Sequence, residues 1–270
     1  MGEPPRPAAS RTPGARGAAG SLAGRETPGA PGAAGWLAGR LAVVTGASRG
    51  IGAATAAAMA AAGAHVVLAA RDRRALDGVA GRIADAGGQA TPVPTDVSDE
   101  AAVGRLFAGA ARIGPLSALV CAAGALTPAP FAGTTPALWH EMLGVNLTGT
   151  FLCCRAAFIA MAAAGEGRII TIASLSGVYA TEKFPGLAAY NVSKYGVVGL
   201  TEAIAVEGKE HRISAVCLSP GAVDTQMLRR ANPALRPGLT PGEVADLIVA
   251  LLDGPLAAVS GANIPLFSNA

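Results

Sequence analysis

From residue 41 onward, short apolar runs alternate with longer, Ala-rich stretches. Short apolar runs bounded by turn residues are typical of buried strands, and the longer stretches have the length of helices. The predicted strands cover residues 41–45, 65–70, 91–95, 118–122, 168–173, 214–219 and 263–266. The predicted helices lie near residues 50–62, 73–86, 99–112, 135–164, 188–209 and 241–252. This alternation along the chain predicts an α/β protein.

Each connection between the predicted strands is long enough to join parallel neighbours through a crossover. Right-handed crossovers of this kind build a doubly wound parallel sheet, here of about seven strands, with helices on both faces. The length of 270 residues fits one such domain, predicted over residues 36–270. No repeat of solenoid period is present in the sequence.

Residues 1–35 differ from the rest in being almost entirely Gly, Ala, Pro, Arg, Ser and Thr. Such a composition cannot bury enough apolar surface to offset the entropy of ordering, so the segment is predicted to be a disordered leader. Its Arg content and scarcity of acids resemble an organelle transit peptide, but its many prolines oppose an amphipathic helix. Three interpretations of residues 1–35 stay open: a functional tail, a targeting leader, or a start codon assigned too far upstream.

Charged residues are spread along the chain rather than gathered in blocks. Lys and Arg number 21 against 18 Asp and Glu, a formal net charge of +3, so we expect no nucleic-acid partner. Hydrophobic residues make up 51% of the chain, but many are Ala and no uninterrupted apolar run reaches the roughly 18 residues of a membrane span. The sequence therefore predicts a soluble protein with no membrane partner.

The cysteines and histidines show no spacing typical of metal ligands. Cys121, Cys153, Cys154 and Cys217 lie inside apolar segments, which favours buried, inert thiols. A reducing, cytoplasmic location follows as the simplest expectation. We predict no metal site.

Glycines gather where the first predicted strand meets the first predicted helix. The segment Gly46-Ala47-Ser48-Arg49-Gly50-Ile51-Gly52 follows that strand directly. Glycine lets the backbone turn sharply and approach a ligand, while the free N–H groups and positive dipole end of the helix favour an anion. A chain with 36 glycines forms some clusters by chance, but this position predicts a dinucleotide site.

The Thr45-Gly46 pair, followed by three residues and Gly50-x-Gly52, resembles the turn of the short-chain dehydrogenase/reductase family. Further family motifs follow in order: Asp96-Val97, Ala123-Gly124, Asn146 in Val-Asn-Leu-Thr-Gly, Ser174, Tyr190-x-x-x-Lys194 and Pro220-Gly221. The resemblance covers about residues 41–266 and extends to members like the NADP-dependent 3-oxoacyl-ACP reductases. It implies a Rossmann fold and an oxidoreductase.

The choice between nicotinamide cofactors depends on the residue that ends the second predicted strand. An acid there would bind the ribose 2′-hydroxyl and repel a 2′-phosphate, but the chain has Ala70. Arg71 follows, and Arg49 lies in the glycine turn, so two guanidinium groups are expected to converge on a 2′-phosphate. The resemblance associates this arrangement with NADP(H). The alternative is that Arg71, Arg73 and Arg74 form a solvated helix start.

By the same resemblance, Asp96 and Val97 contact the adenine ring, and the Pro220-Gly221 bend lies against the nicotinamide, with Val223 and Thr225 at its carboxamide and phosphate end. The residues expected to bind the cofactor are Gly46, Ser48, Arg49, Gly50, Ile51, Gly52, Arg71, Asp96, Val97, Ala123, Gly124, Asn146, Tyr190, Lys194, Pro220, Gly221, Val223 and Thr225.

Tyr190 is the predicted catalytic general acid/base. A free phenol titrates near about 10, so its pKa must fall by roughly 2 to 3 for service at neutral pH. Lys194, four positions later on the same helix face, is expected to supply the cation that lowers it. The family pattern implies that Ser174 donates a hydrogen bond to the substrate oxygen and that Asn146 holds a water that relays protons to Lys194.

Each of these catalytic residues has a structural alternative. Ser174 is a possible turn or cap residue, Asn146 a helix irregularity and Tyr190 a half-buried packing residue. Their joint occurrence in family order disfavours those alternatives. Ser176, close to Ser174, either touches substrate or shapes the loop.

Two departures from the family pattern stand out. The usual Asn-Asn-Ala-Gly is replaced by Cys121-Ala122-Ala123-Gly124, so an amide that braces the central sheet is missing. The longer interval from Ser174 to Tyr190 predicts a loop insertion beside the site. A lid is expected over residues 222–241; its Arg229, Arg230 and Arg236 are either ligands for an acidic substrate or exposed lid residues.

The leading hypothesis is therefore an NADP(H)-dependent oxidoreductase acting on a small-molecule carbonyl or secondary alcohol, of the ketone or 3-oxoacyl reductase type. An NAD-linked alcohol dehydrogenase and a non-catalytic NADP-sensing protein are the alternatives. The resemblance also implies a homo-oligomer, a tetramer, built through the long helices near 135–164 and 188–209. The sequence does not specify the substrate.

Overall fold

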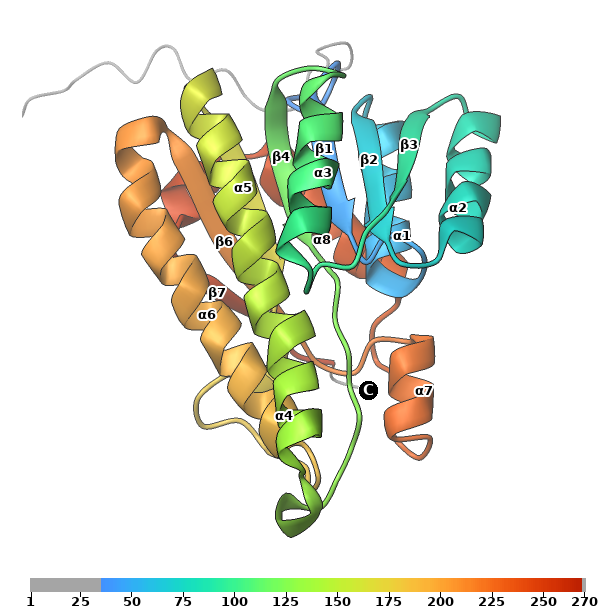
Figure 1. The fold of residues 1–270 in the computed structure, drawn as a ribbon, viewed down its shortest axis with the longest axis vertical. Helices are drawn as coiled ribbons and strands as arrows, with labels where there is room; N and C mark the ends of the chain where they lie inside the picture. The colour runs from blue at the N-terminus through green and yellow to red at the C-terminus, as the bar shows by residue number, and fades with distance from the viewer. Residues whose placement is uncertain (1–34, 269–270) are drawn as a thin grey trace, which may run out of the picture. The chain divides into compact units, whose positions relative to one another are not determined.

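Parallel strands form the centre of the molecule (Figure 1). The computed structural model describes residues 35–268, which belong to one compact unit. The leader predicted over residues 1–35 lies, apart from Gly35, outside the described residues. Seven strands pair side by side in the order β3-β2-β1-β4-β5-β6-β7, and every pair is parallel. The predicted doubly wound sheet is confirmed.

The strands are β1 Leu41–Thr45, β2 His65–Ala70, β3 Gln89–Pro94, β4 Leu116–Cys121, β5 Gly167–Ile172, β6 Ile213–Pro220 and β7 Asn263–Leu266. The helices are α1 Gly50–Ala61, α2 Arg73–Asp85, α3 Glu100–Ala111, α4 Pro136–Leu143, α5 Gly149–Ala164, α6 Ala188–Gly208, α7 Gln226–Ala231 and α8 Pro241–Asp253. All seven predicted strands are present, with boundaries that differ by at most two residues.

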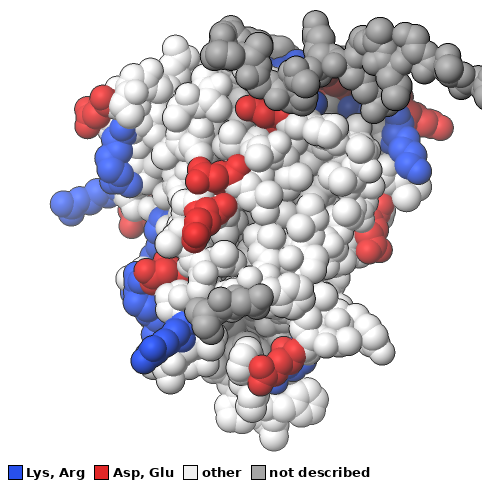
Figure 2. Space-filling model, turned by 180° about the vertical axis from the view of Figure 1, so that it is seen from behind, with Lys and Arg blue, Asp and Glu red and all other residues white. Residues whose placement is uncertain are grey.

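Alternation along each strand divides the core into two layers. In β1, Ala42 and Val44 face the layer that α1, α2 and α8 cover, whereas Leu41 and Val43 face the layer of α3 and α5. Helices therefore pack on both faces of the sheet (Figure 1). On the face seen in Figure 2, basic side chains are interspersed with acidic ones and leave wide uncharged areas.

The helix predicted over residues 135–164 is interrupted. Between α4 and α5 lies a π-helical segment, Gly144–Thr148, which contains Asn146. The hydrophobic pattern runs through all three parts, so periodicity alone could not reveal the wider turn. Segments of this kind often mark functional sites.

The stretch Pro136–Ala164 is also long and apolar enough to cross a membrane, with a mean hydropathy of 1.6. In this structure its α5 part covers the sheet, where Cys153, Ala157 and Met161 are buried in the core. An apolar helix packed on a sheet passes the same compositional test as a membrane span. Its outer face exposes Phe151 and Ile159.

The order of the strands creates a switch point between β1 and β4. The chain runs outward from β1 to β3 on one side and from β4 to β7 on the other. In open α/β sheets, ligands bind beyond the carboxyl ends of the strands at such a point. A cavity of about 990 Å³ lies at this place and is lined by the segments that follow the strands.

Candidate active site

The glycine turn lines one end of the cavity. Gly46 has a φ of +65°, and a Cβ there would lie 2.6 Å from Ala122 O. A Cβ on Gly52 would lie 2.4 Å from Gly46 O. Any side chain at these two positions would therefore push the turn open.

The helix that follows the turn has a free N-terminus. Arg49 precedes α1 in extended conformation, and no side chain caps the helix. By contrast, Asp72 and Asp99 cap α2 and α3 with their carboxylates. The first N–H groups of α1 are thus available to an anion, which fits the pyrophosphate of a dinucleotide.

Both arginines expected at a 2′-phosphate line this end of the cavity. Arg49 donates from Nη1 to Gln226 Oε1 at 3.2 Å, which links the turn to the start of α7. Arg71 follows Ala70 at the end of β2 and is exposed. The nearby acid, Asp72, accepts a hydrogen bond from Ala75 N at 3.0 Å and is engaged in capping α2.

Asp96 also lines the cavity. Its Oδ1 accepts hydrogen bonds from Ser98 Oγ at 2.7 Å and from Ser98 N at 3.0 Å. These bonds, with a smaller contribution from the charge of Arg71, hold the pKa of the Asp96 carboxyl below its usual range. Asp96 is therefore negatively charged, and its charge offsets part of the positive charge of the arginines at this end of the cavity.

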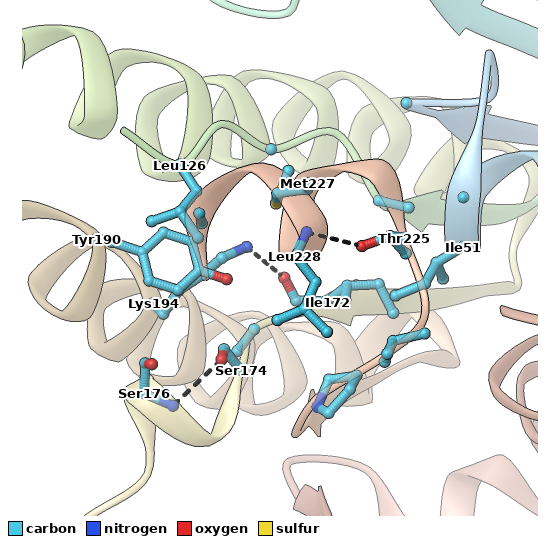
Figure 3. A pocket seen from close by; sticks show the side chains of 18 of the residues that line it. Ile51, Leu126, Ile172, Ser174, Ser176, Tyr190, Lys194, Thr225, Met227 and Leu228 are labelled. Carbon is cyan, nitrogen blue, oxygen red and sulfur yellow. Dashed lines mark hydrogen bonds between the residues drawn. The ribbon is translucent and has the colours of Figure 1, made fainter. Parts of the chain in front are cut away.

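Ser174, Tyr190 and Lys194 meet at the other end of the cavity (Figure 3). Ser174 follows β5, and its Oγ accepts a hydrogen bond from Ser176 N at 3.2 Å. Tyr190 and Lys194 lie one turn apart on α6, with Lys194 Nζ 5.6 Å from the centre of the Tyr190 ring. Lys194 is buried, and its Nζ donates to Ile172 O at 2.9 Å.

Contrary to the expected fall, the pKa of Tyr190 lies above its usual value. Desolvation raises the pKa of the phenol, and hydrogen bonding with Ser174 offsets only part of the rise. The same desolvation lowers the pKa of Lys194 to about 8, against a weaker opposing effect of Cys217 and Cys121. Removing water from both groups disfavours both charged forms.

Asn146 is the one predicted site residue that does not line the cavity. Its side chain is buried, with Oδ1 accepting from Ala125 N at 2.7 Å. Nδ2 donates to Ala125 O and to Ser193 Oγ, both at 3.0 Å. Both amide hydrogens are thus used within the protein, where they brace the wall. The roles of Asn146 in contacting the cofactor and holding a relay water stay predictions.

Every other predicted catalytic or cofactor residue lies in the wall. These are Gly46, Ser48, Arg49, Gly50, Ile51, Gly52, Arg71, Asp96, Val97, Ala123, Gly124, Ser174, Tyr190, Lys194, Pro220, Gly221, Val223 and Thr225. Val97 follows β3 and Pro220 ends β6, so the wall brings together segments from the carboxyl ends of strands on both sides of the switch point.

Sequence reasoning missed the helix that covers the site. The lid predicted over residues 222–241 contains α7, whose Gln226, Met227 and Leu228 line the cavity. Thr225 caps this helix by accepting a hydrogen bond from Leu228 N at 3.2 Å. The signal was present, because Thr before a run of helix-forming residues is a common helix start. Arg229 pairs with Asp224, and Arg229, Arg230 and Arg236 are not wall residues.

The segment in which the family amide is replaced is tied to β1 by a hydrogen bond. Ala123 N donates to Thr45 Oγ1 at 3.2 Å, which ties the segment after β4 to β1. Cys121 Sγ packs 3.7 Å from Cys154 Sγ, and burial raises the pKa of Cys153 to about 12. The four thiols are buried. Across residues 35–268, no group of three His, Cys, Asp or Glu side chains is placed to hold a metal ion.

A family model described as short chain dehydrogenase matches residues 40–236. A cis-4-hydroxycyclohexanecarboxylate dehydrogenase of Sinomonas cyclohexanicum is 38% identical over 234 residues, 82% of this chain and 92% of that protein. A 3-oxoacyl-[acyl-carrier-protein] reductase of Synechocystis is 35% identical over 228 residues, 81% of this chain and 91% of that protein.

Solved structures resemble the fold over nearly the same range. A short-chain type dehydrogenase/reductase from Mycobacterium marinum superposes with a TM-score of 0.81 at 33% identity, covering 86% of this chain and 95% of that one. A 3-oxoacyl (acyl-carrier-protein) reductase from Agrobacterium tumefaciens C58, with NADP bound, gives 0.79 at 30% identity, covering 87% and 95%.

Proposed function

The chain belongs to the short-chain dehydrogenase family, and on that premise we propose that it is an NADP(H)-dependent oxidoreductase that interconverts a ketone and a secondary alcohol. One observation carries the proposal. Ser174, Tyr190 and Lys194 share a single cavity with a glycine turn and two arginines at its far end. A hydride carrier and a proton donor can therefore act on one carbonyl from fixed positions.

The residues at the catalytic end supply proton and hydrogen-bond chemistry. Bound NADP(H) supplies or accepts the hydride. The Tyr190 hydroxyl gives its proton to the carbonyl oxygen, and its raised pKa keeps that proton in place at neutral pH. Ser174 donates a hydrogen bond to the same oxygen as negative charge develops there. The Lys194 ammonium stabilises the tyrosinate that remains.

The proposed preference for NADP(H) depends on the residues at the other end of the cavity. Arg49 and Arg71 offer two guanidinium groups, and Ala70 leaves the position free of an acid. A 2′-phosphate carries two negative charges that such groups bind through charge-assisted hydrogen bonds. The NADP named with the Agrobacterium structure supports the same choice.

The relatives suggest the type of substrate. One is named for a hydroxylated ring and another for a 3-oxoacyl group on a carrier protein. Both names describe a secondary alcohol or a ketone. We therefore propose a ketone or 3-oxoacyl-type carbonyl as the substrate.

The test is to titrate the purified chain with NADPH and with NADH by fluorescence, and then to follow oxidation of the tighter ligand with ketones, aldehydes and 3-oxoacyl thioesters. Tyr190→Phe should reduce turnover by about 100- to 10,000-fold, while the Kd for NADPH changes far less. Tight NADPH binding without turnover of any compound, unchanged in the variant, would instead indicate a cofactor sensor.

A further inference from the structure

The half of the cavity around Tyr190 has apolar walls. They come from three segments: the stretch after β4, the loop between β5 and α6, and α7. Their apolar members are Leu126, Val178, Phe184, Leu187, Met227 and Leu228. Figure 3 shows Leu126 and Met227 beside the space into which the Tyr190 hydroxyl points.

Helix α7 reaches the catalytic groups themselves. A Cβ placed on Gly124 would lie 3.7 Å from Lys194 Nζ and 3.9 Å from Met227 Cε. The methyl group of Met227 and the ammonium of Lys194 thus approach the same point from different helices. A substrate held at Tyr190 therefore meets the hydrocarbon side chains of α7.

The positively charged side chains of the described cavity wall either lie at the cofactor end or are buried and already hydrogen-bonded. Among the residues described, the cations of the wall are Arg49, Arg71 and Lys194. The two arginines lie at the glycine turn and the end of β2, and Lys194 is buried with Nζ bonded to Ile172 O. The β5–α6 loop contributes the phenol of Tyr179 and one carboxylate, the exposed Glu182, to the wall.

From this distribution we propose that the substrate is an uncharged aliphatic ketone or its secondary alcohol, and that the site disfavours a carboxylate in the half of the cavity around Tyr190. The proposal rests on the proposed function for the reaction itself. A carboxylate placed between Leu126 and Met227 would lose water, and the wall cation at this end, Lys194, already donates a hydrogen bond to Ile172 O. Glu182 at the loop would add repulsion between like charges.

This preference separates the chain from the Sinomonas relative, which is named for a carboxylated substrate. Two probes with the same ring and carbonyl isolate the charge: 4-methylcyclohexanone and 4-oxocyclohexanecarboxylate. Their Kd values are measured by calorimetry on the Tyr190→Phe chain saturated with NADPH, so that binding is read without turnover. The neutral ketone should bind at least about tenfold more tightly.

Turnover of the same two probes by the unmodified chain is measured separately. If the neutral ketone binds more tightly but is not reduced, the proposed reaction fails and the preference of the site stands. Equal or tighter binding of the carboxylate, or binding of neither probe, overturns the proposal whatever the turnover.

Glu182→Gln tests the charge contribution directly. It should narrow the ratio of the two Kd values by about two- to fivefold, the range of an exposed charge interaction. Glu202→Gln removes the same charge from an exposed position of α6 outside the cavity wall and should leave the ratio unchanged. Equal effects of the two substitutions would overturn the repulsive role of Glu182.

Discussion

Asn146 and Ala125 exchange two hydrogen bonds: Asn146 Oδ1 accepts from Ala125 N at 2.7 Å, and Nδ2 donates to Ala125 O at 3.0 Å. Because Nδ2 also donates to Ser193 Oγ, one buried amide joins the stretch after β4 to α6. The wall between Gly124 and Lys194 therefore depends on a residue that lies behind it.

Replacing Asn146 with Ala should lower the free energy of unfolding by about 2–4 kcal/mol, because several buried polar groups would lose their partners. Urea unfolding followed by circular dichroism measures the change. Asn191→Ala is the control, since the buried Asn191 Oδ1 makes no hydrogen bond to any described residue and its loss should cost less. Equal losses in the two variants would contradict the bracing role.

The buried ammonium of Lys194 should make stability rise with pH. Its pKa is about 8 in the folded chain against an ordinary value of 10.5. Between these pH values the unfolded chain binds more protons than the folded chain, so the free energy of unfolding rises as pH increases. The stabilising effect of Lys194→Met should accordingly shrink by about 2 kcal/mol between about pH 7.5 and 9.5. Urea unfolding of the native chain and of Lys194→Met at the two pH values checks this. If the two free energies of unfolding differ by the same amount at both pH values, the lowered pKa of Lys194 is excluded.

The pKa of Tyr190 should lie above that of an ordinary phenol, because desolvation raises it. The ultraviolet absorbance of phenolate, recorded against pH for the native chain and for Tyr190→Phe, isolates this group by subtraction. A difference curve with its midpoint below that of a free phenol would show that the charge of Lys194 outweighs desolvation.

Arg71→Ala should weaken NADPH binding by about tenfold and leave the Kd for NADH nearly unchanged, since a charge-assisted hydrogen bond contributes about 1.5–3 kcal/mol and Arg71 is exposed. Fluorescence titration gives both values. Arg74→Ala serves as the matched control, because Arg74 is exposed on α2 and is not a wall residue. No change in the Arg71 variant would favour the NAD-linked alternative.

Exposed aliphatic side chains on the outer faces of α5 and α6 lead us to expect a homo-oligomer. Ile159 on α5 and Val206 on α6 are 63% and 65% exposed, and exposed aliphatic side chains on neighbouring helices favour self-association. We expect light scattering to show an oligomer, with a tetramer as the specific prediction, and Ile159→Glu to dissociate it. Ile113→Glu places the same charge beyond α3 and should leave the mass unchanged. A native monomer would remove the prediction.

Local patterns in the sequence determined the parts of this protein that depend on near neighbours. The hydrophobic patterns of strands and helices were sufficient to predict the parallel sheet. A spacing of four residues placed Tyr190 and Lys194 on one face of α6. The glycine turn was equally readable, because a side chain at Gly52 would meet Gly46 O within the turn itself.

Only the tertiary structure decided the features that depend on distant segments. The hydrogen bonds of Asn146 join three separate stretches, and the pKa of Tyr190 depends on how much water the surrounding loops and helices exclude. Likewise, the apolar walls arise where α7 meets the segment after β4. Sequence patterns report which face of an element is buried, whereas desolvation and hydrogen bonding depend on what packs against that face.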